Sequence, residues 1–112
     1  MTPKVYDVTQ LFDDYRAFFE LKGSVNMLLT ADAAQEVCNE ALKYNLLVIR
    51  AEGGIWHHPG FEARLDSIWD GRAPPLAKAH AETNNRKAAE SIREDHREMG
   101  YNVFIITALS NC

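Results

Sequence analysis

The chain has 112 residues, of which 46% are hydrophobic and 25% are charged, and its formal net charge at pH 7 is −4. This length and composition are typical of one folded domain with its own core, so we expect residues 1–112 to form a single compact unit and not a disordered chain. The negative charge argues against a nucleic-acid binder, because such proteins contact phosphate groups through a basic surface.

The N-terminal part of the chain predicts two helices separated by a strand. Asp7 and Gln10 have the spacing of a helix-capping box, and an apolar stripe at helical spacing follows them. A short apolar run over residues 24–29 predicts a strand. A second helix is expected from about Ala31, with Thr30 as its N-cap.

The middle of the chain predicts a hairpin followed by a short helix. Residues 45–58 are expected to form two strands joined at Glu52-Gly53-Gly54, since this tripeptide can supply a positive-φ turn. The second strand would end at Pro59-Gly60. Residues 61–70 then carry apolar side chains at i, i+4, i+7 and i+8, which predicts an amphipathic helix that ends at Gly71.

The C-terminal part predicts a long helix over residues 74–99 and an inner strand over the apolar, β-branched residues 102–109. The expected order is therefore an N-terminal helix and then β-α-β-β-α-α-β. This order indicates an α+β fold with helices on one face of a mostly antiparallel sheet. It matches the split β-α-β arrangement of ferredoxin-like sandwiches, in which the first and last strands would lie side by side in the middle. An open α+β sandwich with another strand order is the alternative.

The long helical pattern also bears on assembly. One helix of 26 residues, from 74 to 99, would extend roughly 39 Å, whereas a compact domain of this length has a diameter near 34 Å. We therefore expect either a break at Thr83-Asn84-Asn85, which are poor helix formers, or a projecting helix covered by a second copy of the chain. Because its apolar stripe is thin, a homodimer that uses this helix is predicted. The stripe consists of Ala81, Ala88, Ile92 and Met99.

Two adjacent histidines, His57 and His58, precede the Pro-Gly turn. Imidazole exchanges protons near neutral pH, so one of them could act as a general base with Glu52 or Glu62 as its partner. Neighbours on a strand point to opposite faces, so only one histidine would meet a pocket. The alternative is that both are surface residues of an edge strand. The sequence has no nucleophile motif and no metal-ligand spacing, so we expect no bound metal or cofactor.

Trp56 and Trp69 flank the same turn. With Phe61 they could wall an aromatic pocket whose polar mouth is His57 or His58, and such pockets bind planar or cationic ligands. This hypothesis requires the two indoles to lie within about 12 Å of each other. The alternative is that both tryptophans pack into the core.

Three carboxylates, Glu62, Asp66 and Asp70, recur at i, i+4 and i+8. On the predicted helix they would repel one another by a few tenths of a kcal/mol per pair, and Asp70 would lie at the unfavourable end of the helix dipole. The apolar side chains of that helix would face the core, so the carboxylates would face outward. They form either a solvated surface or a docking site for a basic partner.

Cys38 and Cys112 lie far apart in the sequence and belong to no metal or redox motif, which predicts two free thiols in a reducing cytoplasm. No segment has the roughly 18 consecutive apolar residues of a membrane span, and the first residues do not form a signal peptide. We therefore expect a soluble cytoplasmic protein that does not bind membranes.

These observations favour a non-enzymatic binding or interaction protein over a small cofactor-free enzyme. Its expected partners are a second copy of the chain, a basic protein or a small planar ligand, and not nucleic acid. A small acidic inhibitor of a basic enzyme would fit this class by analogy.

Overall fold

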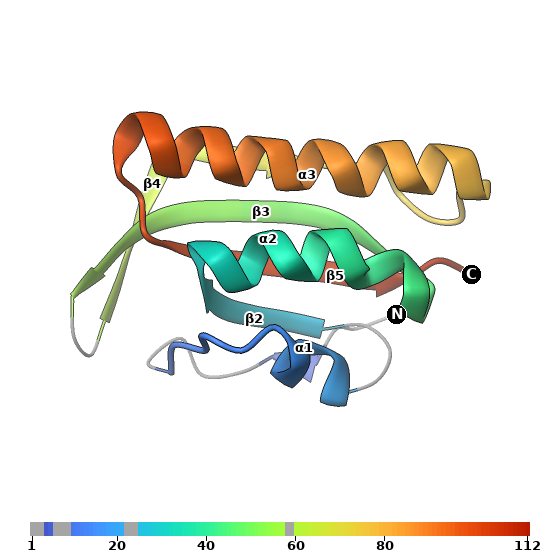
Figure 1. Cartoon of the computed structure of the whole chain (residues 1–112), viewed down its shortest axis with the longest axis horizontal. Coiled ribbons are helices and arrows are strands. Elements are labelled where there is room, and N and C mark those ends of the chain that lie inside the picture. The colour runs from blue at the N-terminus through green and yellow to red at the C-terminus, as the bar shows by residue number, and fades with distance from the viewer. Residues whose placement is uncertain (1–3, 6–9, 22–24, 58–59) are drawn as a thin grey trace.

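The computed structural model describes residues 4–5, 10–21, 25–57 and 60–112, in which one sheet carries helices on one face (Figure 1). The strands are β1 (Lys4–Val5), β2 (Val25–Thr30), β3 (Leu46–His57), β4 (Gly60–Asp70) and β5 (Val103–Ser110). The helices are α1 (Arg16–Glu20), α2 (Ala31–Glu40), the 3-10 helix η1 (Ala41–Tyr44) and α3 (Lys78–Met99). The predicted α+β fold, with helices on one face of a mostly antiparallel sheet, is confirmed.

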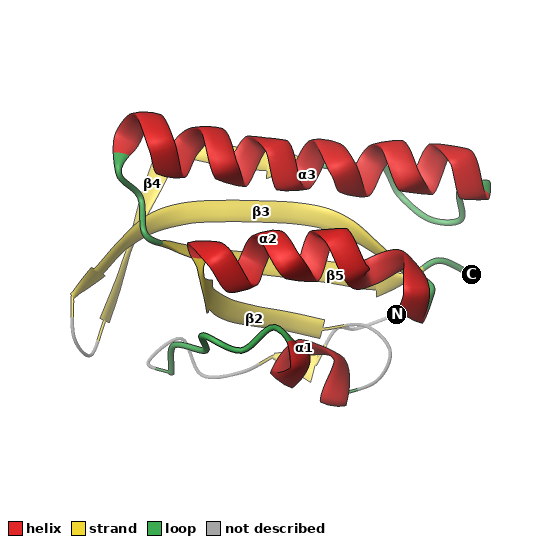
Figure 2. Ribbon diagram, in the orientation of Figure 1, coloured by secondary structure: helices red, strands yellow, loops and turns green. Residues whose placement is uncertain are grey.

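The strand order is β1-β2-β5-β3-β4, with β1 parallel to β2 and every other neighbouring pair antiparallel (Figure 2). The strand predicted to come first, β2, lies beside the last strand, β5, and β5 is an inner strand as expected. The chain forms two interlocked split β-α-β units. In one, β5 lies between β2 and β3; in the other, β3 lies between β4 and β5. The β3–β4 hairpin therefore forms one edge of the sheet.

The helix predicted over residues 61–70 is wrong, because these residues belong to strand β4. The turn predicted at Glu52-Gly53-Gly54 is also wrong, since β3 continues from Leu46 to His57. Apolar spacing in so short a window fits a helix or an irregular strand equally well. Pairing with β3 gives the backbone of β4 a long ladder of hydrogen bonds, whereas a helix of ten residues is marginal by itself.

The N-terminal helix is shorter than predicted. Asp7, the first residue of the expected capping box, lies outside the described residues, and α1 covers only Arg16–Glu20. Phe12 lies beside β2 instead: its N–H donates to the carbonyl of Leu28 at 3.1 Å, and its own carbonyl accepts from Thr30 N–H at 2.9 Å. The segment around Phe12, which the apolar pattern assigned to a helix, is therefore hydrogen-bonded to the sheet.

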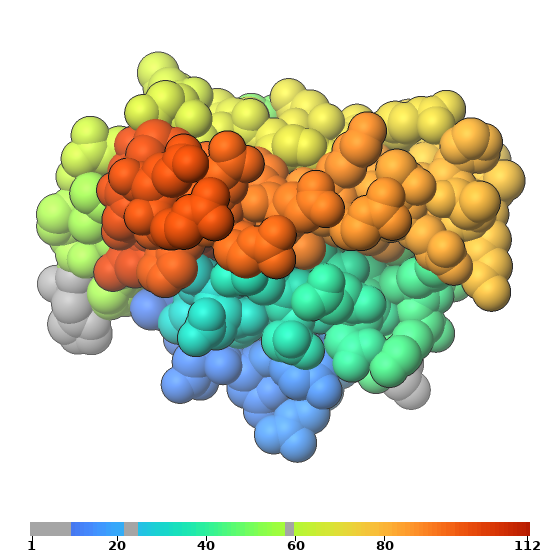
Figure 3. Space-filling view, turned by 45° about the horizontal axis from the view of Figure 1, so that its top comes forward, coloured from blue at the N-terminus to red at the C-terminus, as the bar shows by residue number. Residues whose placement is uncertain are grey.

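Helix α2 begins where the sequence predicted. The hydroxyl of Thr30 accepts a hydrogen bond from Ala33 N–H at 3.3 Å, as an N-cap does. In Figure 3, α2 and α3 lie next to each other over the sheet. No helix in the described part of the chain is long and apolar enough to span a membrane.

Helix α3 is one unbroken helix of 22 residues, so the break predicted at Thr83-Asn84-Asn85 is wrong. At 1.5 Å per residue it extends about 33 Å. The molecule measures 38 × 27 × 20 Å, so its long axis accommodates the helix without an overhang. The predicted overhang is wrong because it assumes a spherical domain, whereas the domain is elongated.

The thin apolar stripe on α3 is covered by its own chain. Ala81, Ala88 and Ile92 are almost fully buried, and only Met99 remains exposed. This stripe is therefore not available to a second copy, which corrects the expected use of the helix in a dimer. The homodimer itself stays a prediction.

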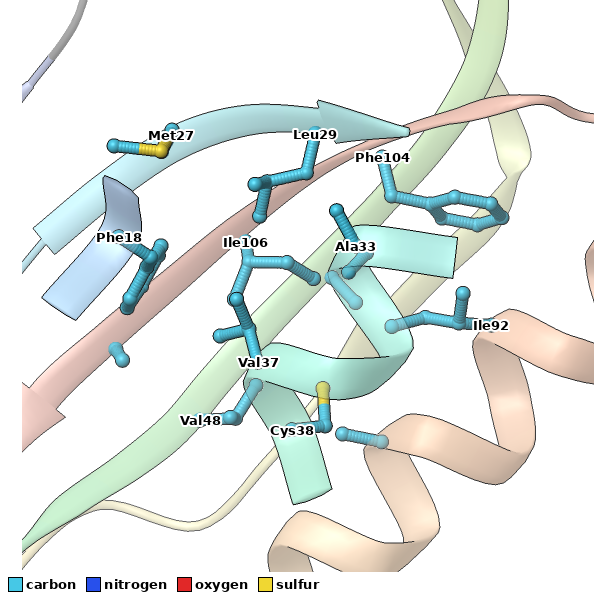
Figure 4. Packing of buried hydrophobic residues seen from close by; sticks show 14 of the residues in the cluster. Phe18, Met27, Leu29, Ala33, Val37, Cys38, Val48, Ile92, Phe104 and Ile106 are labelled. Carbon is cyan, nitrogen blue, oxygen red and sulfur yellow. The ribbon is translucent and has the colours of Figure 1, made fainter. Parts of the chain in front are cut away.

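The core fills the space between the sheet and the helices (Figure 4). Alternate residues of β2 and β5 point toward this layer, among them Met27 and Ile106. Phe18 from α1, Val37 from α2 and Ile92 from α3 pack against them. The three helices thus share one apolar cluster on the same face of the sheet.

The two cysteines are both free, as predicted, but their surroundings differ. Cys38 is only 2% exposed, and burial raises the pKa of its thiol to about 12; Cys112 is exposed. We expect an aromatic disulfide reagent at pH 8 to modify Cys112 rapidly and Cys38 only after unfolding in denaturant, because the thiolate is the reactive form. If the native protein rapidly released two equivalents of aromatic thiol from the reagent, α2 would not protect Cys38.

Candidate protein-binding site

The edge strand β4 carries all three carboxylates that the sequence analysis singled out. It pairs with β3 on one side, and in the described part of the chain no strand pairs with its other side. Edge strands leave backbone donors and acceptors unpaired, and proteins either shield such edges or use them to bind a partner. This edge is therefore the first candidate for a binding surface.

A large bulge interrupts β4. Glu52 of β3 pairs with Ile68, whereas Gly54 pairs with Ala63, so an advance of two residues on β3 corresponds to five on β4. Residues 64–67 thus lie opposite Gly53 alone, three residues more than a regular ladder would hold. Bulges of this kind occur at sheet edges and redirect side chains.

Two side-chain hydrogen bonds hold the bulge against the rest of the fold. The hydroxyl of Ser67, which is buried, donates to Asp95 Oδ2 on α3 at 2.6 Å. The hydroxyl of Tyr101 donates to Asp66 Oδ1 at 2.7 Å. This bond, and then burial, raises the pKa of Tyr101, so its hydroxyl stays protonated as a donor. The bulge is therefore a fixed feature of the edge.

Gly53 and Gly54 lie opposite the bulge and make room for it. A Cβ atom on Gly53 would collide with the Ser67 side chain, and one on Gly54 would collide with the backbone carbonyl of Glu62. The glycine pair thus permits close approach of β4, and this function replaces the turn that the sequence analysis expected there. A glycine inside a strand often marks such a contact.

Leu65 lies in the bulge with 87% of its surface exposed. The sequence analysis placed it on the buried face of a helix, so its exposure was missed. A lone exposed leucine is ordinary on a protein surface. This leucine differs because its neighbours Asp66 and Ser67 are both anchored by hydrogen bonds. The fold therefore presents an apolar side chain in a defined position among charged residues.

The three carboxylates lie along β4 and not on a helical face, which corrects the expected stripe. Each has a partner within the protein: Glu62 pairs with Arg64 at 2.6 Å, Asp66 accepts from Tyr101, and Asp70 lies 3.7 Å from Arg50. The helix-dipole penalty predicted for Asp70 does not arise on a strand. The carboxylates remain at the surface, where they give the edge its acidic groups.

The residues of the alternative enzymatic hypothesis are only partly brought together. His57 Nε2 and Glu62 Oε1 are 2.7 Å apart, but the pair is open to solvent, with side-chain exposures of 62% and 43%. Glu62 pairs across the ladder with Ile55, which faces the helices, whereas Glu52 points to the other face beside Arg50. His58 lies outside the described residues. No set of three or more potential metal ligands is found among the described residues.

The two tryptophans do not wall one pocket, so that hypothesis is wrong. Trp56 pairs with Phe61, whereas Trp69 pairs with Ala51, five residues away along β3, a separation of roughly 17 Å. Trp69 packs against the core on the helical side, and alternation along β3 places Trp56 on the opposite face. Trp56 and Phe61 are neighbours as expected; Trp69 borders a different cavity, beside α3.

Comparison with known proteins adds an independent finding. The family described as Colicin-E5 Imm protein matches residues 27–109. The chain is 52% identical over 102 residues to the immunity protein CdiI of Burkholderia pseudomallei, which covers 91% of this chain and 92% of that protein. It is 43% identical over 81 residues to two Escherichia coli proteins, the colicin-E5 immunity protein and the colicin-E5 immunity protein in ColE9. These alignments cover 72% of this chain and 96% of each relative.

Proposed function

Because the chain belongs to the colicin-E5 immunity protein family, we propose that it is an immunity protein that binds and inhibits the toxin domain of a colicin-E5-type toxin. It acts by protein–protein association and catalyses no reaction of its own. The observation in the structure that carries this proposal is the edge strand β4, which combines a fixed bulge, an exposed Leu65 and three carboxylates.

The chemistry of this edge suits a basic partner. Glu62, Asp66 and Asp70 lie on a chain whose net charge is −4, so the edge attracts a positively charged surface over several ångströms. Leu65 supplies apolar contact in the middle of these charges. Charged rims increase the association rate and select the partner, whereas a buried apolar side chain slows dissociation.

The proposal is tested by mixing the purified protein with colicin-E5-type toxin domains and measuring residual toxin activity. We expect stoichiometric inhibition of at least one toxin domain, with a one-to-one complex in sedimentation. If none of these toxin domains is inhibited or bound at micromolar concentration, the proposed function is wrong.

Replacing the three carboxylates by amides, in the variant E62Q/D66N/D70N, tests the docking edge. The amides keep hydrogen-bond acceptors for Arg64 and Tyr101, so the fold should persist while the attractive charge is lost. We expect the association rate with the toxin domain to fall about tenfold at low salt, and its dependence on salt to weaken.

The matched control, D13N/E20Q/E36Q, removes three exposed carboxylates that lie outside β4. This control changes the net charge by the same amount as the first variant. We expect its association rate to stay within about twofold of the rate of the unmodified protein, because its carboxylates lie away from the docking edge. Equal losses in the two variants would show that only net charge matters, and a sharp drop in thermal stability of the first variant would assign its carboxylates a structural function.

A further inference from the structure

A cavity of about 390 Å³ lies between the end of β4 and the N-terminal half of α3, away from the bulge. This volume is in the range of small-molecule sites. Trp69, Asp70 and Arg72 come from the strand end and the segment after it, and His80, Asn84 and Lys87 come from the helix. In Figure 3 the yellow-green residues of β4 follow the outer side of the orange helix α3.

The floor of this cavity is held in place by backbone contacts. The side chain of Asn84 is buried; its Oδ1 accepts from Arg72 N–H at 2.9 Å and its Nδ2 donates to the carbonyl of Val48 at 2.8 Å. Gly71 allows the chain to pass closely here, because a Cβ atom would lie 2.8 Å from both Asn84 Oδ1 and the Trp69 ring. The cavity is therefore formed before any ligand binds.

The charge of the cavity is opposite to that of the protein. Arg72, His80 and Lys87 line it against a single carboxylate, Asp70, although the chain as a whole is acidic. Asp70 also lies 3.7 Å from Arg50. In the described part of the chain none of the three basic side chains forms an ion pair within the protein. Guanidinium and ammonium groups in this arrangement are suited to a phosphate.

The aromatic wall defines the rest of the ligand. Trp69 is half-buried and packs against the core, so its ring is fixed where it borders the cavity. A planar ring can stack on such a side chain, and this contact stabilises binding whatever the identity of the ring. Asp70 adds an acceptor for amino or hydroxyl groups.

We infer that this cavity binds a phosphorylated planar ring compound, the chemical class of a nucleoside monophosphate. The ring stacks on Trp69, and the phosphate lies among Arg72, His80 and Lys87. The inference does not rest on the proposed toxin binding, although Asp70 borders this cavity and also belongs to the proposed docking edge.

The two tryptophans make the site directly measurable. In the variant Trp56→Phe, Trp69 is the only tryptophan left, so its fluorescence reports on the cavity alone. We expect adenosine 5′-monophosphate to quench it with a dissociation constant below about 1 mM. Adenosine and inorganic phosphate should each bind at least tenfold more weakly, because each lacks half of the contacts. Calorimetry on the unmodified chain gives the same comparison without any substitution.

Variants on the cavity rim complete the test. Arg72→Ala and Lys87→Ala, both at exposed positions, should each weaken binding of adenosine 5′-monophosphate about tenfold. Arg86→Ala is the matched control, since Arg86 is adjacent on the same helix, lies 3.8 Å from Glu90 and does not line this cavity. The inference is overturned if no saturable binding occurs at millimolar nucleotide. It is also overturned if phosphate alone binds as tightly, or if the control loses as much affinity as Lys87→Ala.

Discussion

Replacing Asn85 with leucine is expected to lower the free energy of unfolding by about 2–5 kcal/mol, although the two side chains have similar volumes. Asn85 is buried on α3; its Oδ1 accepts from Val48 N–H at 2.9 Å and its Nδ2 donates to the carbonyl of Leu46 at 3.0 Å. β4 pairs with β3 only from Arg50 onward, so within the described residues no strand lies beside this part of β3 on that side. The amide of Asn85 takes the place of that strand.

Urea unfolding measures the effect, with Arg86→Leu as the control. This control introduces the same side chain one position along the helix, but on its solvent side, where a surface pair with Glu90 is lost. Its stability should change by less than about 0.5 kcal/mol. If Asn85→Leu also remains within that limit, the backbone of β3 finds other partners and the account of this edge is wrong.

Replacing Leu65 with aspartate is expected to weaken binding of the toxin domain at least 100-fold, if the proposed docking edge is correct. A charge at this position would be buried without a partner in the complex, and it would repel the neighbouring Asp66. Because Leu65 is 87% exposed in the free protein, the free energy of unfolding should change by less than about 0.5 kcal/mol. Titration calorimetry measures the affinity for the toxin domain, and urea unfolding measures the free energy of unfolding.

Tyr44→Asp serves as the comparison for this variant. Tyr44 is also an exposed apolar side chain, but it lies on η1, just before the start of β3 and away from the bulge, where it stacks on Phe19. Affinity for the toxin domain should change less than threefold. Unchanged binding of Leu65→Asp would place the interface elsewhere, while inhibition of the toxin by the unmodified protein would still support the immunity function.

The functional class followed from the sequence more readily than the site. The net charge of −4 and the lack of a nucleophile or metal motif indicated an interaction protein, and the family match agrees with that class. The positions of the carboxylates on β4 followed only in part: the residues were identified, but on the wrong type of element. The exposed position of Leu65 was not predicted. It depends on the anchoring pairs Ser67–Asp95 and Tyr101–Asp66, which join residues far apart in the sequence, and no local pattern indicates such contacts.

The sequence by itself determined the elements whose signals are local. The N-cap at Thr30 marks the start of α2, because a capping hydroxyl and the helix it caps are adjacent in the chain. The apolar, β-branched run before Ser110 specified β5 as a strand, because β-branched side chains pack well on a pleated sheet, and β5 lies inside the sheet as expected.

Tertiary structure alone decided the edge of the sheet. Residues 60–70 became a strand because β3 offers them a ladder of hydrogen bonds, and Gly53 and Gly54 leave space for their bulge. Asn84 and Asn85 are poor helix formers, yet α3 continues through them, since their amides bind the backbone of β3. Helix propensities differ by tenths of a kcal/mol per residue, whereas an unpaired buried backbone group costs about 1–3 kcal/mol. Long-range hydrogen bonding therefore outweighed the local preference at both places.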